Sequence, residues 1–220
     1  MKRVFRNAML AGFASVILVS CGGGPSGEKV SSDEAKTTSE DVLADATFSV
    51  DTDQSVLEWE GAKIAYAHDG LISLSDGEIM VSDGRISGGS FEIDMNSIVC
   101  LDLEDPEKNA NLVGHLKSAD FFEVETYPAA TFEITSTEHI EGDRHSITGN
   151  LTLKDVTRSI TFPASISIAE NMLKASTDQF VIDRSEWNVR FASPSFFNDL
   201  KDDFIKDEIG LKISLVASVQ

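Results

Sequence analysis

The segment IGLKISLVASV at residues 209–219 alternates two kinds of side chain along its whole length. Ile, Leu, Ala and Val occupy every second position, and Gly, Lys and Ser fill most of the positions between them. Successive side chains of a β-strand point to opposite faces, so this period of two predicts a strand with one apolar and one hydrated face. The same alternation recurs elsewhere, at residues 56–63, 90–95, 131–135, 146–153 and 159–162.

Turn-forming residues lie between these predicted strands. The sequences SDG at 75–77, SDG at 82–84 and EGD at 141–143 have the composition of hairpin turns. Short strands joined by tight turns favour an all-β, antiparallel meander. About eight such strands, each with one apolar face, either close into a barrel or stack as a sandwich.

Two stretches depart from the period of two. Asp105 followed by Pro106 is typical of a helix start, with Asp as the N-cap and Pro at the first helical position. The apolar spacing that follows predicts a helix over residues 106–118. A second helix is predicted over residues 194–206, where no clear capping residue precedes it, so the fold is expected to carry one or two short helices.

The N-terminal residues have the features of a bacterial lipoprotein leader. Basic residues precede an uncharged apolar run at residues 8–19, which is too short to span a bilayer. The sequence LVSC at residues 18–21 follows and resembles the lipobox read by lipoprotein signal peptidase. Residues 1–20 are therefore predicted to be a signal peptide, and Cys21 is predicted to carry the lipid that anchors the protein to a membrane. An ordinary secretory leader that happens to contain a cysteine is the alternative.

The composition changes after the leader. Residues 22–46 are rich in Gly, Ser, Thr, Asp and Glu, so residues 21–46 are predicted to comprise the lipidated cysteine and a flexible linker. Residues 47–220 form the remaining domain, which is long enough for a core that encloses a cavity. Gly22 after the cysteine, in place of Asp, resembles the outer-membrane sorting pattern of enteric bacteria. The expected location is therefore the cell envelope, at the outer membrane facing the periplasm.

The chain is strongly acidic. Its 37 Asp and Glu residues outnumber its 18 Lys and Arg residues, which gives a formal net charge of −19. Such a surface repels nucleic acid, so nucleic-acid binding is excluded as a function class. The acidity does not identify a partner, because it also serves solubility. The sequence leaves the oligomeric state open, and a homodimer is one alternative.

Motifs for catalysis or metal binding are absent from the sequence. The four histidines lie in separate predicted elements without metal-ligand spacing, and the common hydrolase and nucleotide fingerprints do not occur. No catalytic residue, metal ligand or cofactor is therefore predicted. Cys100 has no expected partner once Cys21 is acylated, and it is predicted to be an apolar core or loop residue, with a reactive thiol as the alternative.

Six short blocks follow one another along the domain. They are WEGAK at 59–63, GGSF with DMNSI at 88–98, GHLKS with DFF at 114–122, YPAATF at 127–132, TGNLTL with VT at 148–157, and DRS with a Trp at 183–187. Together and in this order they resemble the YceI-like family of polyisoprenoid-binding, lipocalin-like proteins. Asp155 and Asn188 stand where this family commonly has Gly, and both residue types tolerate the positive φ of a turn.

This resemblance implies an eight-stranded antiparallel, lipocalin-like barrel that holds a long-chain amphiphile, such as a polyprenyl lipid or an isoprenoid quinone. Lys63 and Arg184 are predicted contacts for a polar head group, since Lys63 shares a strand face with inward residues and the Arg fork suits phosphate or carbonyl oxygens. The alternatives are that Lys63 extends to water and that Asp183-Arg184 is a structural ion pair or strand-end cap. The predicted ligand contacts of the apolar interior are Leu57, Trp59, Phe91, Ile93, Met95, Phe132, Ile134, Leu151, Leu153, Phe162, Phe180 and Ile182.

The sequence leads to three functional hypotheses. The first is a non-enzymatic, lipid-anchored protein that binds, sequesters or transports an isoprenoid or similar lipid in the cell envelope. The second is a structural or interaction lipoprotein whose barrel is filled by side chains. The third is an envelope hydrolase with two carboxylates at the barrel mouth, which for glycoside hydrolysis would lie roughly 5–10 Å apart.

Overall fold

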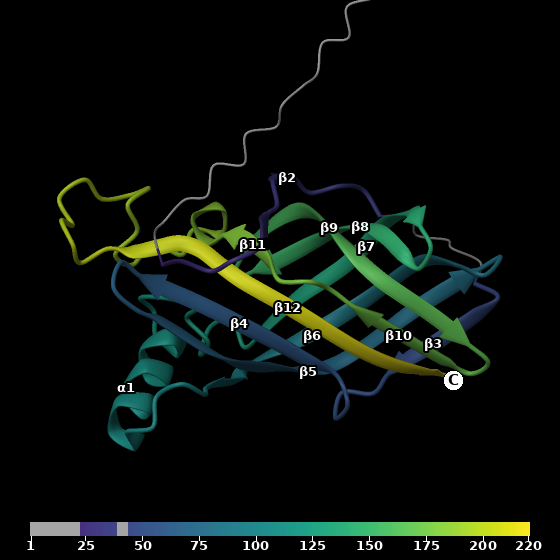
Figure 1. Cartoon of the computed structure of the whole chain (residues 1–220), viewed down its shortest axis with the longest axis horizontal. Coiled ribbons are helices and arrows are strands. Elements are labelled where there is room, and N and C mark those ends of the chain that lie inside the picture. Colours follow the sequence, from purple (N-terminus) through teal and green to yellow (C-terminus); the bar gives the residue numbers. More distant parts are fainter. Residues whose placement is uncertain (1–22, 39–43) are drawn as a thin grey trace, which may run out of the picture.

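Figure 1 shows the computed structural model as an elongated ring of strands with a helix beside one end. The structure describes residues 23–38 and 44–220, so the predicted signal peptide and Cys21 lie outside the described residues. The helices are α1 (Pro106–Lys117) and the 3-10 helix η1 (Arg184–Trp187). The strands are β1 (Glu28–Lys29), β2 (Ser32–Glu34), β3 (Ala46–Val50), β4 (Val56–Lys63), β5 (Ala67–Ser82), β6 (Arg85–Cys100), β7 (Ala129–Glu141), β8 (Arg144–Leu153), β9 (Val156–Ala169), β10 (Met172–Ser176), β11 (Phe180–Asp183) and β12 (Ile205–Val219).

Hydrogen-bonded pairing closes the long strands on one another. From β5 the order runs through β6, β7, β8, β9 and β10 to β12. β12 pairs in turn with β3 and β4, and both of these pair with β5. β3 and β4 together fill one strand position of the ring, and β10 and β11 together fill another. The ring therefore has eight strand positions. The all-β, eight-stranded antiparallel prediction is confirmed, as a closed ring and not as a stacked sandwich.

Part of the predicted linker belongs to this ring. β1 pairs in parallel with β11, β2 pairs antiparallel with β9, and Val30 between them is 6% exposed. Asn150 holds the segment further, because its side chain donates to the Lys36 carbonyl at 2.7 Å and accepts from the Lys36 amide at 2.9 Å. The prediction of a flexible linker is therefore wrong for residues 28–36. Their composition is polar, but their backbone groups find sheet partners on β9 and β11.

Two of the three predicted turns are confirmed. Asp83 and Gly84 connect β5 to β6 with φ values of 50° and 70°, and Gly142 connects β7 to β8 with a φ of 57°. These positive values are typical of tight hairpins. The predicted turn at 75–77 is wrong, because these residues lie inside β5 where its register with β6 shifts. A β-bulge uses the same Gly-containing composition as a turn, so composition alone does not separate them.

α1 confirms the first predicted helix. The Asp105 side chain accepts from the backbone amides of Glu107 and Lys108 at 3.0 and 3.2 Å, as an N-cap residue does. Pro106 occupies the first turn of the helix. Backbone N–H groups there have no acceptor within the helix, so the N–H that Pro lacks costs no hydrogen bond. No helix within residues 23–38 and 44–220 is long and apolar enough to cross a membrane.

The second predicted helix, at 194–206, is wrong. Turns and irregular backbone occupy residues 194–204, and β12 begins at Ile205. Lys201 has a φ of 49°, a left-handed value that interrupts a right-handed helix. The Ile205 amide donates to the Ala192 carbonyl at 2.8 Å, which ties the end of this loop to its beginning.

Gly149 sets the packing between β7 and β8. A Cβ at this position would lie 2.3 Å from the Phe132 ring and 2.6 Å from the Glu133 carbonyl oxygen. Gly149→Ala is therefore expected to lower the free energy of unfolding by ~1–3 kcal/mol, because a ring or a strand must move. Urea unfolding measures the change. Gly114→Ala is the control, since the added methyl group would have no atom within 4 Å beyond the adjacent residues and the backbone of α1, and α1 should gain about 0.5–1 kcal/mol. Equal effects of the two substitutions would contradict this packing.

Candidate functional site

An apolar cavity of about 440 Å³ lies inside the ring. All twelve apolar residues predicted for the interior line this cavity, and so do Lys63 and Arg184. Small-molecule sites typically have volumes of about 300–1,000 Å³, so the cavity is large enough for a ligand. Contact of these residues with a lipid stays a prediction.

The period of two explains why these side chains meet in one cavity. On β6, Phe91 and Met95 are buried and line the cavity, whereas Ser90 and Glu92 are exposed on the outer face. Alternation therefore separates the wall of the cavity from the hydrated surface. The same rule applies on the neighbouring strands, so each long strand contributes several apolar side chains.

Aromatic rings form a continuous band on the cavity wall. The ring centroids lie 6.2 Å apart for Phe91 and Phe132, and 5.6 Å apart for Phe132 and Phe162. Phe162 and Phe180 stack at 4.6 Å with their planes 2° apart. Such contacts contribute about 0.5–1.5 kcal/mol each beyond buried area, so the band stiffens the wall across β6, β7, β9 and β11.

The sequence-based set of interior residues is incomplete. β12 closes the ring and adds seven cavity residues, and four of them belong to the alternation at 209–219, which could have identified them. Residues outside the strands complete one end, and no period of two marks them. The added cavity residues include Ile209, Leu211, Ile213 and Leu215 on β12, Leu112 and Leu116 on α1, and Phe121, Phe122 and Phe191 in loops.

One end of the cavity carries polar side chains. We call it the polar end and define it by Lys63, Tyr66, His68, His115 and Lys206, which all line the cavity. β4 ends, β5 begins and β12 begins here, and α1 lies beside them (Figure 1).

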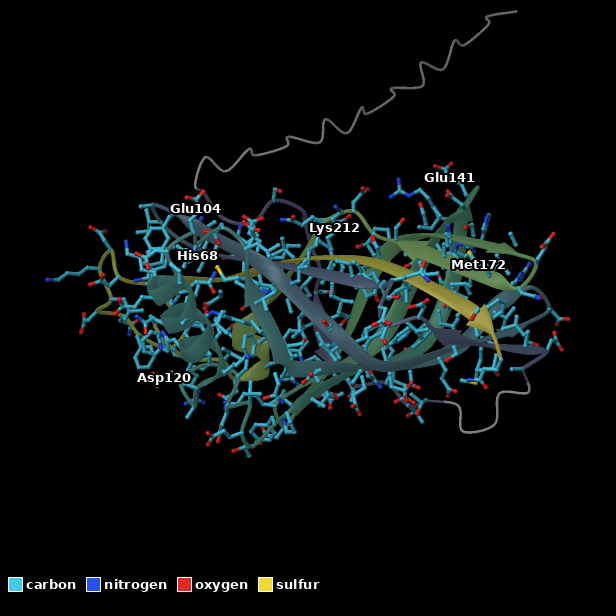
Figure 2. All side chains as sticks on the ribbon, turned by 90° about the horizontal axis from the view of Figure 1, so that it is seen from below. His68, Glu104, Asp120, Glu141, Met172 and Lys212 are labelled. Carbon is cyan, nitrogen blue, oxygen red and sulfur yellow. The ribbon has the colours of Figure 1, made fainter. Side chains whose placement is uncertain are left out.

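Figure 2 places the polar end within the whole molecule. His68 and α1 lie toward one end of the ring, and Glu141 and Met172 lie toward the other. The Lys63 amide donates to the Tyr66 carbonyl at 2.9 Å, which closes the turn between β4 and β5. An apolar interior with polar groups at one end suits an amphiphile whose head group stays near α1.

Arg184 lines the cavity, but backbone carbonyls accept the hydrogen bonds of its guanidinium group. Its Nη2 atom also lies 3.3 Å from a carboxylate oxygen of Asp207. Burial lowers the pKa of Arg184 from its ordinary value, and the charge of Asp207 opposes that change. The contacts support a structural role for Arg184, but its ion-pair partner is Asp207 and not the predicted Asp183. Contact with a head group stays a prediction. The guanidinium N–H groups donate at 2.8–3.1 Å to the carbonyls of Val189, Phe191, Ile205 and Lys206.

Asp183 caps η1 next to this arginine. Its carboxylate accepts from the Ser185 amide at 3.1 Å and from the Ser185 hydroxyl at 2.6 Å, and the Lys29 ammonium lies 3.2 Å away. Burial raises the pKa of Asp183, but these hydrogen bonds outweigh burial and hold the pKa below its ordinary value. The ionised carboxylate therefore stabilises the fold.

Asp183→Asn is expected to lower the free energy of unfolding by about 1 kcal/mol at pH 7. Because folding lowers the pKa, the carboxylate contributes fully above its unfolded pKa near 3.9 and loses this contribution as the pH falls through the folded value. The difference between wild type and variant should therefore shrink as the pH falls below the unfolded pKa near 3.9. Urea unfolding at each pH measures it, and a difference that stays constant would contradict this role.

A closed antiparallel ring around an apolar cavity, with polar groups at one end, defines the class of hollow, lipocalin-like β-barrels. Residues 48–217 match the model of the YceI-like domain. The match covers most of the chain, which therefore belongs to the YceI-like family, as the six blocks predict. Asn188 adopts the expected positive φ, at 60°. In the turn between β8 and β9 the residue with positive φ is Lys154, at 56°, and not Asp155.

Curated relatives match over a shorter segment. Protein YceI of Salmonella arizonae is 50% identical over 52 residues, which are 24% of this chain and 27% of that protein. Protein YceI of Salmonella newport gives the same values. The matched segment thus spans about a quarter of the length of these relatives.

Solved structures match over most of the ring. BcnA of Burkholderia cenocepacia has a TM-score of 0.62 at 23% identity, with 77% of this chain and 99% of that chain covered. A polyisoprenoid binding domain from Saccharophagus degradans has a TM-score of 0.61 at 15% identity, with 80% and 99% covered. At these identities the likeness shows the shared fold.

Proposed function

We propose that this protein binds a long-chain isoprenoid or similar amphiphilic lipid, without chemical turnover, and sequesters or transports it in the bacterial cell envelope. The observation that carries the proposal is the apolar cavity of about 440 Å³ with its polar end. A cavity of this size argues against a barrel filled by side chains. The solved neighbour described as a polyisoprenoid binding domain gives the proposal further support.

The cavity supplies binding energy through its apolar wall. Each methylene group moved from water into such a site gains about 0.8 kcal/mol, so a chain that buries about ten of them gains roughly 8 kcal/mol before the cost of immobilisation. Lys63 at the polar end offers a cation to a phosphate or carbonyl head group. Affinity should therefore rise with chain length until the cavity is full.

Displacement of a fluorescent fatty-acid probe from the purified full chain tests this function. Polyprenols and isoprenoid quinones of increasing chain length are added as competitors. We expect displacement that strengthens with chain length and then reaches a plateau. Folded protein that takes up neither the probe nor any competitor would rule the proposal out.

We further propose that lipid on Cys21 anchors the protein to the outer membrane, facing the periplasm, with the polar end toward the bilayer. The described chain begins at Gly23, which lies next to Ile64: a Cβ added at Gly23 would be 3.9 Å from the Ile64 carbonyl oxygen. A Cβ added at Gly24 would contact the side chain of Lys206. The described chain therefore begins beside the polar end, and Cys21 precedes Gly23 by two positions in the sequence. Exposed apolar side chains surround this end and suit a lipid surface: Ile64, Tyr66, Leu101 and Phe197.

Cys21→Ser is expected to move the protein from the membrane fraction to the soluble fraction of the source cells or of a bacterial host. The physical reason is that the variant loses the acyl chains that hold lipoproteins on a bilayer. Immunoblots of separated membranes measure the distribution. Cys100→Ser is the control and should stay with the outer membrane. Equal membrane fractions for both variants would contradict anchoring through Cys21.

A further inference from the structure

A cluster of three potential metal ligands lies beside the polar end. It comprises His68 on β5, Cys100 at the end of β6 and Asp102 just after it, and one ligand atom from each lies within 4.8 Å of the other two. His68 Nδ1 is 2.8 Å from one Asp102 carboxylate oxygen, and Cys100 Sγ is 3.2 Å from the other. The sequence predicts no metal ligands because these residues meet only through the pairing of β5 with β6.

Backbone hydrogen bonds fix the cluster in place. The Asp69 amide donates to the Asp102 carboxylate at 3.1 Å, and the Leu101 amide donates to the Asp69 carbonyl at 2.9 Å. Asn109 on α1 donates from Nδ2 to the Cys100 carbonyl at 2.9 Å. The loop that carries Cys100 and Asp102 is therefore held both by β5 and by the helix, which gives the three side chains a defined relation.

We propose that His68, Cys100 and Asp102 form a binding site for a divalent transition-metal ion, with Zn²⁺ as the ligand that suits it best. Imidazole, thiolate and carboxylate are the three donor types that zinc uses in proteins. A hard cation such as Mg²⁺ or Ca²⁺ would not select a thiolate and an imidazole. Three protein ligands leave the fourth tetrahedral position for water.

The spacing of the donors fits a tetrahedral ion. Zinc bonds of about 2.0–2.3 Å place neighbouring ligand atoms roughly 3.3–3.8 Å apart. His68 Nδ1 and Cys100 Sγ contact different oxygens of Asp102, at 2.8 and 3.2 Å, so both separations must widen by roughly 0.3–0.5 Å and one oxygen must turn toward both donors. His68 is only half-buried and Asp102 is exposed, so small side-chain rotations supply this adjustment.

The charges of the cluster favour a cation. The Cys100 thiol donates to an Asp102 carboxylate oxygen at 3.2 Å. Binding of zinc replaces this proton, which leaves a thiolate and a carboxylate around the ion. The formal net charge of −19 attracts cations to the surface as well.

Cobalt and zinc titrations of metal-free full-length protein, without added lipid, test the site. All proteins carry Cys21→Ser, so that Cys100 is the only thiol, and contain a non-chelating phosphine reductant. We expect one Co²⁺ per chain, a thiolate-to-cobalt charge-transfer band in the near ultraviolet, and loss of the band when Zn²⁺ is added. Cys100→Ser should abolish the band.

The half-exposed ligands give variants that are expected to fold. His68→Gln and Asp102→Asn should weaken Zn²⁺ binding at least ~100-fold. Substitution of residues that only hydrogen-bond to a metal ligand already lowers metal affinity about 10–100-fold. His115→Gln is the matched control. His115 Nε2 lies 3.3 Å from Asp120, but no cysteine in the described part of the chain completes this His–Asp pair, so the variant should bind Zn²⁺ like the parent. Circular dichroism checks folding. Absence of the cobalt band in the parent, or equal zinc affinity in parent and His68→Gln, would overturn the proposal.

Discussion

Replacing Arg184 with methionine is expected to lower the free energy of unfolding by ~3–5 kcal/mol, the loss typical of a buried charge pair from which one partner is removed. Arg184 is 1% exposed and Asp207 is 5% exposed, so the variant leaves a carboxylate in the interior without its cation. It also removes the donor that binds four backbone carbonyls of β12 and the preceding loop. Urea unfolding at neutral pH measures the loss.

Two comparisons separate the contributions to this effect. Arg190→Met is the control, because Arg190 is exposed and stacks on Phe196 at 4.6 Å, a contact that contributes about 0.5–1 kcal/mol. The double variant Arg184→Met with Asp207→Asn should recover part of the loss, since the unpaired charge is gone. A loss at Arg184 no larger than at Arg190 would contradict the structural role of the buried guanidinium.

Filling the cavity with two phenyl side chains is expected to reduce lipid affinity by at least ~100-fold, which is about 2.7 kcal/mol. Ala164 on β9 and Ala175 on β10 both line the cavity. A cavity of ~150 Å³ accommodates benzene, so two added rings occupy more than half of the space available to a ligand chain. The double variant Ala164→Phe with Ala175→Phe therefore fills the cavity without adding a polar group. Titration with the fluorescent fatty-acid probe measures the affinity.

Ser167→Phe is the matched control for cavity filling. Ser167 lies on β9 as Ala164 does, but it is exposed on the outer face, so the same phenyl ring lies outside the cavity. This control should bind the probe like wild type. Thermal unfolding of all variants checks that the fold persists, and a folded double variant with wild-type affinity would contradict binding inside the cavity.

The period of two explains why so much of the cavity is predictable from sequence. Alternation along β4, β6, β7, β8 and β9 assigns each side chain to the inner or the outer face, and the predicted residues do line one cavity. Tertiary pairing decides the rest. Ser75 forms a bulge and not a turn because β5 pairs with β6 on both sides of it, at Leu74 and at Asp76. Polar residues 28–36 join the ring because β9 and β11 offer them hydrogen-bond partners.

Contacts between distant segments limit prediction of the site itself. The carbonyls that surround Arg184 come from a loop and from β12, and no local pattern in the sequence brings them together. His68 and Asp102 are 34 residues apart, and they meet because Gly70 pairs with Cys100 across β5 and β6. Side-chain type predicts a candidate donor, whereas strand register decides which donors become neighbours.

Mass spectrometry of lipid extracted from the purified, folded full chain tests the central claim most directly. Wild-type protein isolated from its envelope under mild conditions is expected to release a long-chain isoprenoid or related amphiphile in a molar ratio near one. The variant with Ala164→Phe and Ala175→Phe, isolated in the same way, should release little, and Ser167→Phe should release as much as wild type. Wild-type protein that carries no more lipid than the cavity-filled variant would contradict the claim.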